Sequence, residues 1–217
     1  MKFQTRSASK PFRSRLARVV FIMTLPAAAW ISTVCSSVDF AYLKPQYEQK
    51  EKHSLKRIVL AMDPSSFTNE RVGKLVLAVS RDYLSVQRDY IIYPTPKTSR
   101  AAPPWPDYCA ANRKINGVLR HKVRLLRHYG DSTDFGVQVT LFDCKSGDRI
   151  WDSYGEDDYA SNDPDLKTVI SSYANRVSPE YRYLIGPTYL LVREIFESLP
   201  NPVLTEKEKE EKIDLME

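Results

Sequence analysis

The stretch GVLRHKVRLL, residues 117–126, alternates in the way of a β-strand that has one buried and one solvated side. The odd-numbered positions of this strand are Leu119, His121, Val123 and Leu125, and the even-numbered positions between them are the basic residues Arg120, Lys122 and Arg124. Residues 136–144 alternate in the same manner, and residues 149–159 continue after the turn residues KSGD. Together these segments predict an antiparallel meander with one apolar and one polar face.

The chain ahead of this meander has the order strand, helix, strand. KRIVLAM at 56–62 is a short apolar run with β-branched residues, which predicts a buried strand. Residues 68–87 place their apolar side chains on one helical face, and YIIYP at 90–94 predicts a second strand stopped by Pro94. This order is that of a βαβ unit, and a split arrangement of the two strands is equally compatible with it.

The C-terminal part is mostly helical. Residues 164–199 predict two or three helical segments, because Pro179 and Pro187 interrupt the apolar pattern. Residues 201–217 form a charged tail in which Thr205 and Glu208 have capping-box spacing, so a short helix or a frayed end is expected. The fold expected for residues 56–200 is one α/β (α+β) domain with a sheet of about five strands.

The first 34 residues have the organisation of a secretory signal peptide. Residues 1–18 hold six basic residues and no acidic one, and residues 19–34 carry no charge. This apolar segment is shorter than the roughly 20 residues of a membrane span, and it contains Pro26. A single-pass N-terminal anchor remains the alternative, since basic residues ahead of the segment would keep the N-terminus in the cytoplasm.

Cys35 follows the apolar segment, where bacterial lipoproteins are cut and acylated. The preceding residues, Ser32, Thr33 and Val34, depart from the usual pattern of leucine first and glycine or alanine last. Cleavage after Ala29 by the ordinary signal peptidase is the competing interpretation. With Cys35 as the lipidated residue, residues 35–55 would be a polar tether between the anchor and the domain.

Removal of the signal peptide changes what the net charge implies. The full chain has a formal net charge of +5, and the first 34 residues contribute all of this excess. The remaining chain is therefore close to neutral. Net charge gives no reason to expect a nucleic-acid partner.

Three cysteines are present: Cys35, Cys109 and Cys144. Lipidation of Cys35 leaves two, and the oxidising bacterial envelope allows them to pair. We expect a Cys109–Cys144 disulfide; two buried free thiols are the alternative.

Two features are candidate partner contacts. Residues 95–114 are proline-rich and predict a long loop, in which Trp105 is either a contact residue or a side chain folded back on the core. The basic row Arg120, Lys122 and Arg124 suits an acidic partner or anionic lipid. It also fits an ordinary solvated sheet face with cross-strand partners such as Asp152.

The sequence carries no recognisable catalytic motif. The patterns of nucleophile elbows, phosphate-binding loops and zinc sites are all missing, so no cofactor or metal is expected. The acidic segment 156–165 includes Asp157 and Asp158, which an exported hydrolase could use. A solvated turn in which Asp163 caps the next helix, with Pro164 at its first position, explains the same residues.

The C-terminal segment SLPNPVLTEKEKEEKI, residues 198–213, resembles the ending of an uncharacterised family of bacterial lipoproteins known chiefly from myxobacteria and leptospires. LKRIVLA at 55–61 resembles their opening strand, and Cys109 and Cys144 match their cysteine pair. The resemblance covers most of residues 35–213. It implies an envelope location and a disulfide, and it brings no known enzyme activity.

The sequence therefore predicts a non-catalytic protein of the cell envelope. Cys35 would anchor it by its acyl chains, and Ser36 after the cysteine favours the outer membrane. Its partner would be an unidentified envelope protein, bound through Trp105, Arg120, Lys122 and Arg124. The order of elements loosely resembles the domains of export-associated lipoproteins, which is an analogy of fold alone.

Overall fold

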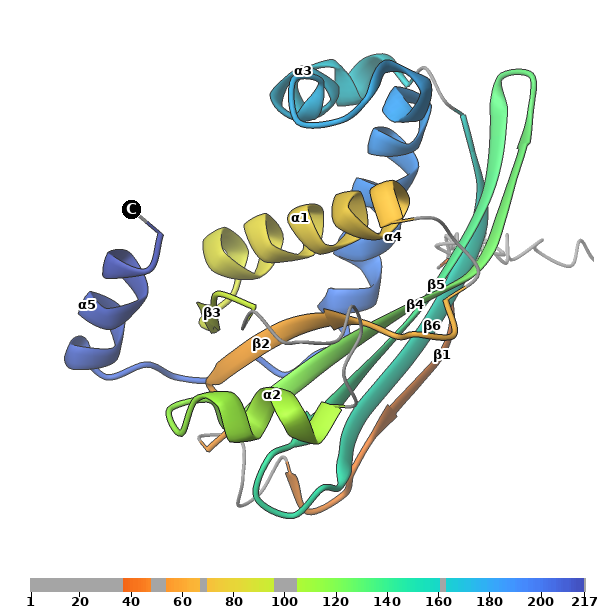
Figure 1. Cartoon of the computed structure of the whole chain (residues 1–217). Helices are drawn as coiled ribbons and strands as arrows, with labels where there is room; N and C mark the ends of the chain where they lie inside the picture. The colour runs from red at the N-terminus through yellow and green to blue at the C-terminus, as the bar shows by residue number, and fades with distance from the viewer. Residues whose placement is uncertain (1–36, 48–53, 67–69, 96–104, 161–162, 217) are drawn as a thin grey trace, which may run out of the picture. The chain divides into compact units, whose positions relative to one another are not determined.

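The alternating stretch lies near the middle of a mixed sheet. The computed structural model describes residues 37–47, 54–66, 70–95, 105–160 and 163–216, and they belong to one compact unit. The signal segment and Cys35 lie outside the described residues. In the described part the sheet has six strands in the order β1-β6-β5-β4-β2-β3 (Figure 1).

The predicted meander is confirmed. Its strands are β4 (Gly117–Tyr129), β5 (Ser132–Asp143) and β6 (Arg149–Ala160), paired antiparallel. A short turn joins β4 to β5, and Gly130 adopts the positive φ of 60° that such turns require. A bulge between Val123 and Leu125 breaks the predicted alternation, so Leu126 packs against the core where Leu125 was expected.

The opening segments form a βαβ unit. β2 (Arg57–Met62) and β3 (Ile91–Tyr93) pair in parallel, and α1 (Glu70–Gln87) connects them. β2 also pairs in parallel with β4 and so joins this unit to the meander. The split arrangement is excluded, because the two strands are direct neighbours.

The tether prediction for residues 35–55 is wrong where the structure describes them. β1 (Val38–Leu43) pairs antiparallel with β6 and forms one edge of the sheet, and Tyr47 is fully buried. Two features of β1 make it difficult to recognise as a strand from the sequence. A bulge between Val38 and Phe40 breaks the period of two, and only the two end residues of the strand pack against the core.

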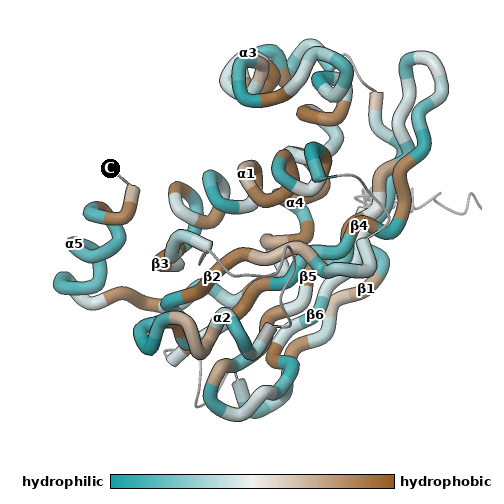
Figure 2. Tube along the Cα trace, in the orientation of Figure 1, coloured by the Kyte–Doolittle hydropathy of each residue, from teal (hydrophilic) through white to brown (hydrophobic). Residues whose placement is uncertain are grey.

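The main core lies between one face of the sheet and the helices α1 and α4 (Ile185–Glu197) (Figure 1). The predicted inward row of β5 is confirmed, since Val137, Val139 and Leu141 are fully buried. Figure 2 shows the hydrophobic segments of these helices gathered toward the sheet. Burial of this apolar surface is the dominant stabilising contribution to the fold.

The predicted helical region is divided at one of its two prolines. It contains the 3₁₀ helices η2 (Pro164–Leu166) and η3 (Pro179–Leu184), with α3 (Lys167–Tyr173) between them and α4 after them. Pro179 begins η3, as expected for an interruption. Pro187 lies in the first turn of α4, where a missing backbone N–H costs nothing, so it does not break the helix.

The loop prediction for residues 95–114 is wrong in its second half. Residues Trp105–Ala111 form the short helix α2, which packs with Tyr108 and Ile115 against the second face of the sheet. The predicted disulfide is present: Cys109 of α2 and Cys144 after β5 have Cα atoms 5.5 Å apart. Trp105 begins α2, but its side chain is outside the described part, so its role stays a prediction.

The charged tail is a docked helix. α5 (Glu206–Asp214) begins with the predicted capping box of Thr205 and Glu208. Figure 2 shows a mostly hydrophilic helix, and it is held largely by charge. Glu208 pairs with Lys56 at 2.8 Å, and Glu211 pairs with Arg57 at 2.6 Å. The expectation that the domain ends at residue 200 is therefore wrong, because these ion pairs, with Leu204 and Leu215 packed on the smaller apolar cluster, hold the tail to the sheet.

Candidate functional site

The basic row of β4 lies on the face of the sheet opposite α1 and α4. Leu119, His121 and Val123 point into the main core, so Arg120, Lys122 and Arg124 project together onto the other face. We call this surface, where α2 does not cover it, the open face. The predicted division of β4 into an apolar and a basic side is confirmed for residues 119–124; beyond the bulge, Leu126 packs on the core in place of Leu125.

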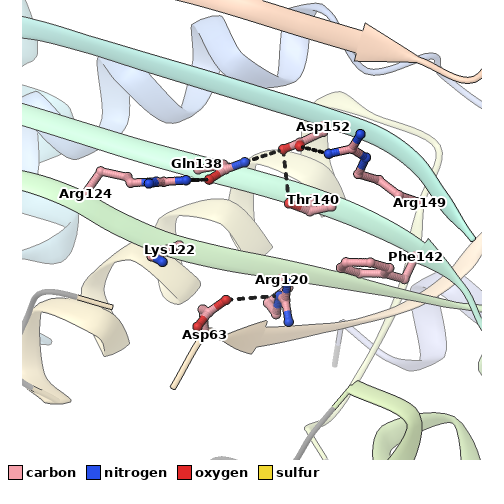
Figure 3. Close-up of a pocket in the computed structure, with 9 residues that line it drawn as sticks. All are labelled: Asp63, Arg120, Lys122, Arg124, Gln138, Thr140, Phe142, Arg149 and Asp152. Atoms are coloured by element: carbon pink, nitrogen blue, oxygen red, sulfur yellow. Dashed lines mark hydrogen bonds and ion pairs between the residues drawn. The ribbon is translucent and has the colours of Figure 1, made fainter. Parts of the chain in front are cut away.

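The basic row lines an open hollow of about 350 Å³ on this face (Figure 3). Its lining comes from three strands and the end of β2, and comprises Asp63, Arg120, Lys122, Arg124, Gln138, Thr140, Phe142, Arg149 and Asp152. Four of these side chains are cationic and two are anionic. Positive charge therefore exceeds negative charge within a concave surface, which favours an anionic ligand.

Asp152 organises one side of the hollow. This carboxylate is only 2 % exposed and accepts three hydrogen bonds, from Gln138 at 2.9 Å, Thr140 at 3.1 Å and Arg149 at 3.0 Å. A buried carboxylate requires such partners to offset its desolvation. The carboxylate of Asp152 is thus bonded to side chains of the protein itself. It does not pair directly with the basic row, contrary to the cross-strand pairing considered from the sequence.

Gln138 connects this carboxylate to Arg124. Its Nε2 donates to Asp152, and its Oε1 accepts from Arg124 Nε at 3.0 Å (Figure 3). The two bonds fix the orientation of the amide, since only one end can donate. They also hold the exposed guanidinium of Arg124 at the rim without neutralising it.

Arg120 is held on the opposite side. Its Nε lies 3.2 Å from Asp63 Oδ2, and its guanidinium carbon lies 4.8 Å from the centre of the Phe142 ring. Burial raises the pKa of Asp63, but hydrogen bonds from the Ser65 hydroxyl and backbone, with the nearby cations, outweigh it and lower this pKa overall. Asp63 stays ionised and keeps Arg120 in place.

Lys122 is the remaining cation. Figure 3 shows it between the Arg124–Gln138 pair and the Arg120–Asp63 pair. Its side chain is half-buried, and no carboxylate of the described residues lies within 4.0 Å of its Nζ. The neighbouring arginines are fixed by other groups, so Lys122 is the donor best placed to meet an incoming anion.

An aromatic margin borders the hollow on β1. Phe40 and Tyr42 are 43 % and 36 % exposed. The register places Tyr42 opposite Asp152 in one cross-strand row, and Phe40 opposite Tyr154 in the next. Tyr42 lies beneath Arg149, whose guanidinium carbon is 5.1 Å from the ring centre. The sequence singles out Phe40 and Tyr42 as residues that either pack on the domain or lie near lipid headgroups. It does not predict the strand that places them beside the hollow, because residues 38–43 lie within the segment predicted to be a tether.

The acidic segment contributes nothing to the hollow. Asp157 and Asp158 are exposed residues at the end of β6; Asp157 accepts from Ser37 Oγ at 3.1 Å, and Asp158 accepts from Ser132. Asp163 caps η2, as the sequence predicted, by accepting from Asp165 N. Within the described ranges no three His, Cys, Asp or Glu side chains are grouped as a metal site would need.

The hollow therefore suits binding of an anion by positioned cations, on a mixed α/β sheet domain. The chain matches no protein-family model, and no curated protein matches it significantly in sequence. The PelC dodecamer from Paraburkholderia phytofirmans is similar in structure, with 15 % identity and a TM-score of 0.49 over 76 % of this chain and 97 % of that protein.

Two further solved structures are similar at the same level. The hypothetical protein CT253 from Chlamydia trachomatis has 12 % identity and a TM-score of 0.44 over 66 % of this chain and 95 % of that one. Lipoprotein GNA1162 from Neisseria meningitidis has 14 % identity and a TM-score of 0.39 over 55 % and 96 %. The similar structures thus include bacterial lipoproteins, and at these identities the likeness concerns the fold alone. Membership of the myxobacterial and leptospiral family stays a prediction.

Proposed function

We propose that this chain is a lipid-anchored, non-catalytic protein of the bacterial cell envelope that binds an anionic envelope component through the hollow on its open face. The observation that carries the binding role is the half-buried Lys122, which has no carboxylate at ion-pair distance among the described residues and is surrounded by arginines held by other groups. Such preorganised cations bind an anion without first reorganising their own side chains.

Export and anchoring are supported by the N-terminal sequence and by the disulfide. The basic start, the apolar segment and Cys35 together fit signal cleavage followed by acylation. The Cys109–Cys144 bridge suits an oxidising compartment. Among the described helices, none is both long and apolar enough for a membrane crossing. Ser36 supports the outer membrane as the destination.

The non-catalytic role is supported by how the polar side chains are used. The carboxylates of the hollow are bonded to neighbouring side chains, and Asp157 and Asp158 each accept from a serine on the exposed end of β6. A hydrolase that uses Asp157 and Asp158 would need these carboxylates in a concave pocket with raised pKa values. An Asp157→Asn variant that lost turnover of an envelope substrate would overturn this part of the proposal.

Photo-crosslinking in living cells tests the binding role. The photoreactive residue p-benzoylphenylalanine is introduced at Phe40, beside the hollow, and at Val86 on α1 as a control. Both positions carry exposed apolar side chains, at 43 % and 65 %. We expect adducts from position 40 only. Equal adducts from both positions, or none from position 40, would contradict the proposal.

The anchor is tested separately by metabolic labelling with a palmitate analogue. The unmodified protein should take up the label, and Cys35→Ala should lose both the label and retention on membranes at high salt. Label that survives in the variant would exclude Cys35 as the acylated residue. A mature N-terminus ahead of residue 35 would exclude it as well.

A further inference from the structure

We infer that the anion bound in the hollow is the headgroup of an anionic phospholipid, in the same membrane that holds Cys35. The open face, with β1 at its margin, would then lie against the bilayer. This inference rests on the proposed function, because it requires the acylated cysteine. It goes further in naming the ligand class and the orientation of the domain.

The first argument is the shortness of the connection. Ser37 is only 6 % exposed, its N–H donates to Glu194 at 3.1 Å, and its carbonyl oxygen accepts from Glu156 N at 3.0 Å. Gly155 permits this close approach, because a Cβ there would come within 2.7 Å of the Ser37 oxygen. Two residues of extended chain span at most about 7 Å, so an acyl anchor on Cys35 holds the start of β1 at the membrane surface.

The second argument is the position of the basic row relative to that point. Val38 pairs with Gly155, which pairs with Val137, and Val137 pairs with Val123, the neighbour of Arg124. Val38 and Arg124 thus lie at the same level along the strands. They are three strand spacings apart, about 14 Å. The hollow is within reach of lipids that surround the acyl chains.

The third argument is the complementarity of the face. Exposed Phe40 and Tyr42 are residues that favour the membrane–water interface, and they share the open face with the cations of the hollow. Their grouping on one face matches the two chemistries of a membrane surface, which are anionic headgroups and an apolar interface.

Lysine modification provides the test. The mature protein, acylated on Cys35, is purified in neutral detergent and reconstituted into vesicles of phosphatidylcholine alone or mixed with phosphatidylglycerol. A membrane-impermeant amine reagent is applied, and modification of Lys122 is measured by mass spectrometry relative to Lys167. Lys167 is an exposed residue of α3, which packs on α4 on the other side of the sheet. The ratio corrects for molecules that face the vesicle lumen.

We expect the Lys122 to Lys167 ratio to fall at least about fivefold in phosphatidylglycerol vesicles compared with detergent, as for the gain of one basic residue at an anionic surface. High salt or the variant Arg124→Glu should restore it. Phosphatidylcholine vesicles should give a smaller effect, since only the anchor and the aromatic margin act there.

The contrary outcomes separate the inference from the proposed function. Equal modification of Lys122 in detergent and in both vesicles overturns the lipid assignment. Protection in native envelopes but not in vesicles also overturns it, and it assigns the hollow to an acidic protein or polymer, so the proposed binding function survives. Absence of protection in vesicles and in native envelopes contradicts both.

Discussion

The fold should lose stability in mild acid because of His121. This residue is fully buried in the core, and neither ring nitrogen meets a partner in hydrogen-bond geometry among the described residues. Its ring lies edge-on to Phe196, with the centroids 6.1 Å apart. Burial lowers the pKa of His121 from 6.5 to about 4, although the nearby backbone of Ala61 and Leu119 opposes the shift in part.

The sign and size of the effect follow from this shift. Between pH 6.5 and about 4 the unfolded chain binds a proton on His121 that the folded chain does not. The free energy of unfolding therefore falls as the pH is lowered through this window and is fully available only above 6.5. At about 1.4 kcal/mol per unit, the complete loss is about 3 kcal/mol, of which about 2 kcal/mol is lost by pH 5.

Urea unfolding from pH 7.5 to 5, followed by circular dichroism, measures this loss. His121→Leu removes the titrating group while it keeps an apolar side chain of similar size. We expect the free energy of unfolding of the variant to depend less on pH, by about 2 kcal/mol over this range. Parallel pH profiles for wild type and variant would refute the reasoning, because burial of His121 would then not govern its protonation.

Three further predictions concern the docked helix α5, the disulfide and Trp105. Glu208→Gln should lower the free energy of unfolding by about 2 kcal/mol, because Lys56 keeps a nearly buried charge without its partner. Glu206→Gln, at a highly exposed position, is the matched control. An equal effect of both variants would be inconsistent with a docked α5. Hydrogen bonding from Lys56 lowers the pKa of Glu208 to about 2, so its contribution is present above the usual pKa of 4.5 and is lost as the pH falls toward 2. The double variant Cys109→Ser, Cys144→Ser should unfold about 3–4 kcal/mol more easily than wild type; unchanged unfolding in urea would mean that the bridge constrains little. Trp105→Ala should leave the thermal midpoint nearly unchanged if Trp105 is a contact residue, whereas a drop of several degrees would place it in the core.

The sequence predicts those parts of the fold whose burial follows a regular period. β4, β5 and β6 keep one face in the core over most of their length, and α1 shows one apolar stripe. β1 could not be recognised, because the bulge after Val38 breaks its period and most of its side chains stay exposed. α2 has only seven residues and is obscured by the prolines around it. α5 docks by ion pairs to Lys56 and Arg57, which leave no hydrophobic pattern.

The candidate site is predictable only in its basic row. The alternation of apolar and basic residues along 117–126 is enough to place Arg120, Lys122 and Arg124 on one side of a strand. The residues that hold them, Asp63, Gln138 and Asp152, come from three other strands or their ends. Whether these residues come close to the basic row depends on strand order and register, and neither can be deduced from the pattern of a single strand. Only the three-dimensional structure shows that no carboxylate of the described residues lies within 4.0 Å of Lys122 Nζ.

The central claim is that the open face binds an anionic component of the envelope through Lys122. Its most direct test is crosslinking from p-benzoylphenylalanine at position 40 in cells that carry Lys122→Glu or, as control, Lys167→Glu. Lys167 is an exposed lysine of α3, so both variants change the net charge equally. We predict that Lys122→Glu reduces the adducts at least about tenfold, the equivalent of 1.4 kcal/mol, whereas Lys167→Glu leaves them unchanged. Adducts that persist in Lys122→Glu, or that fall equally in both variants, would contradict the account.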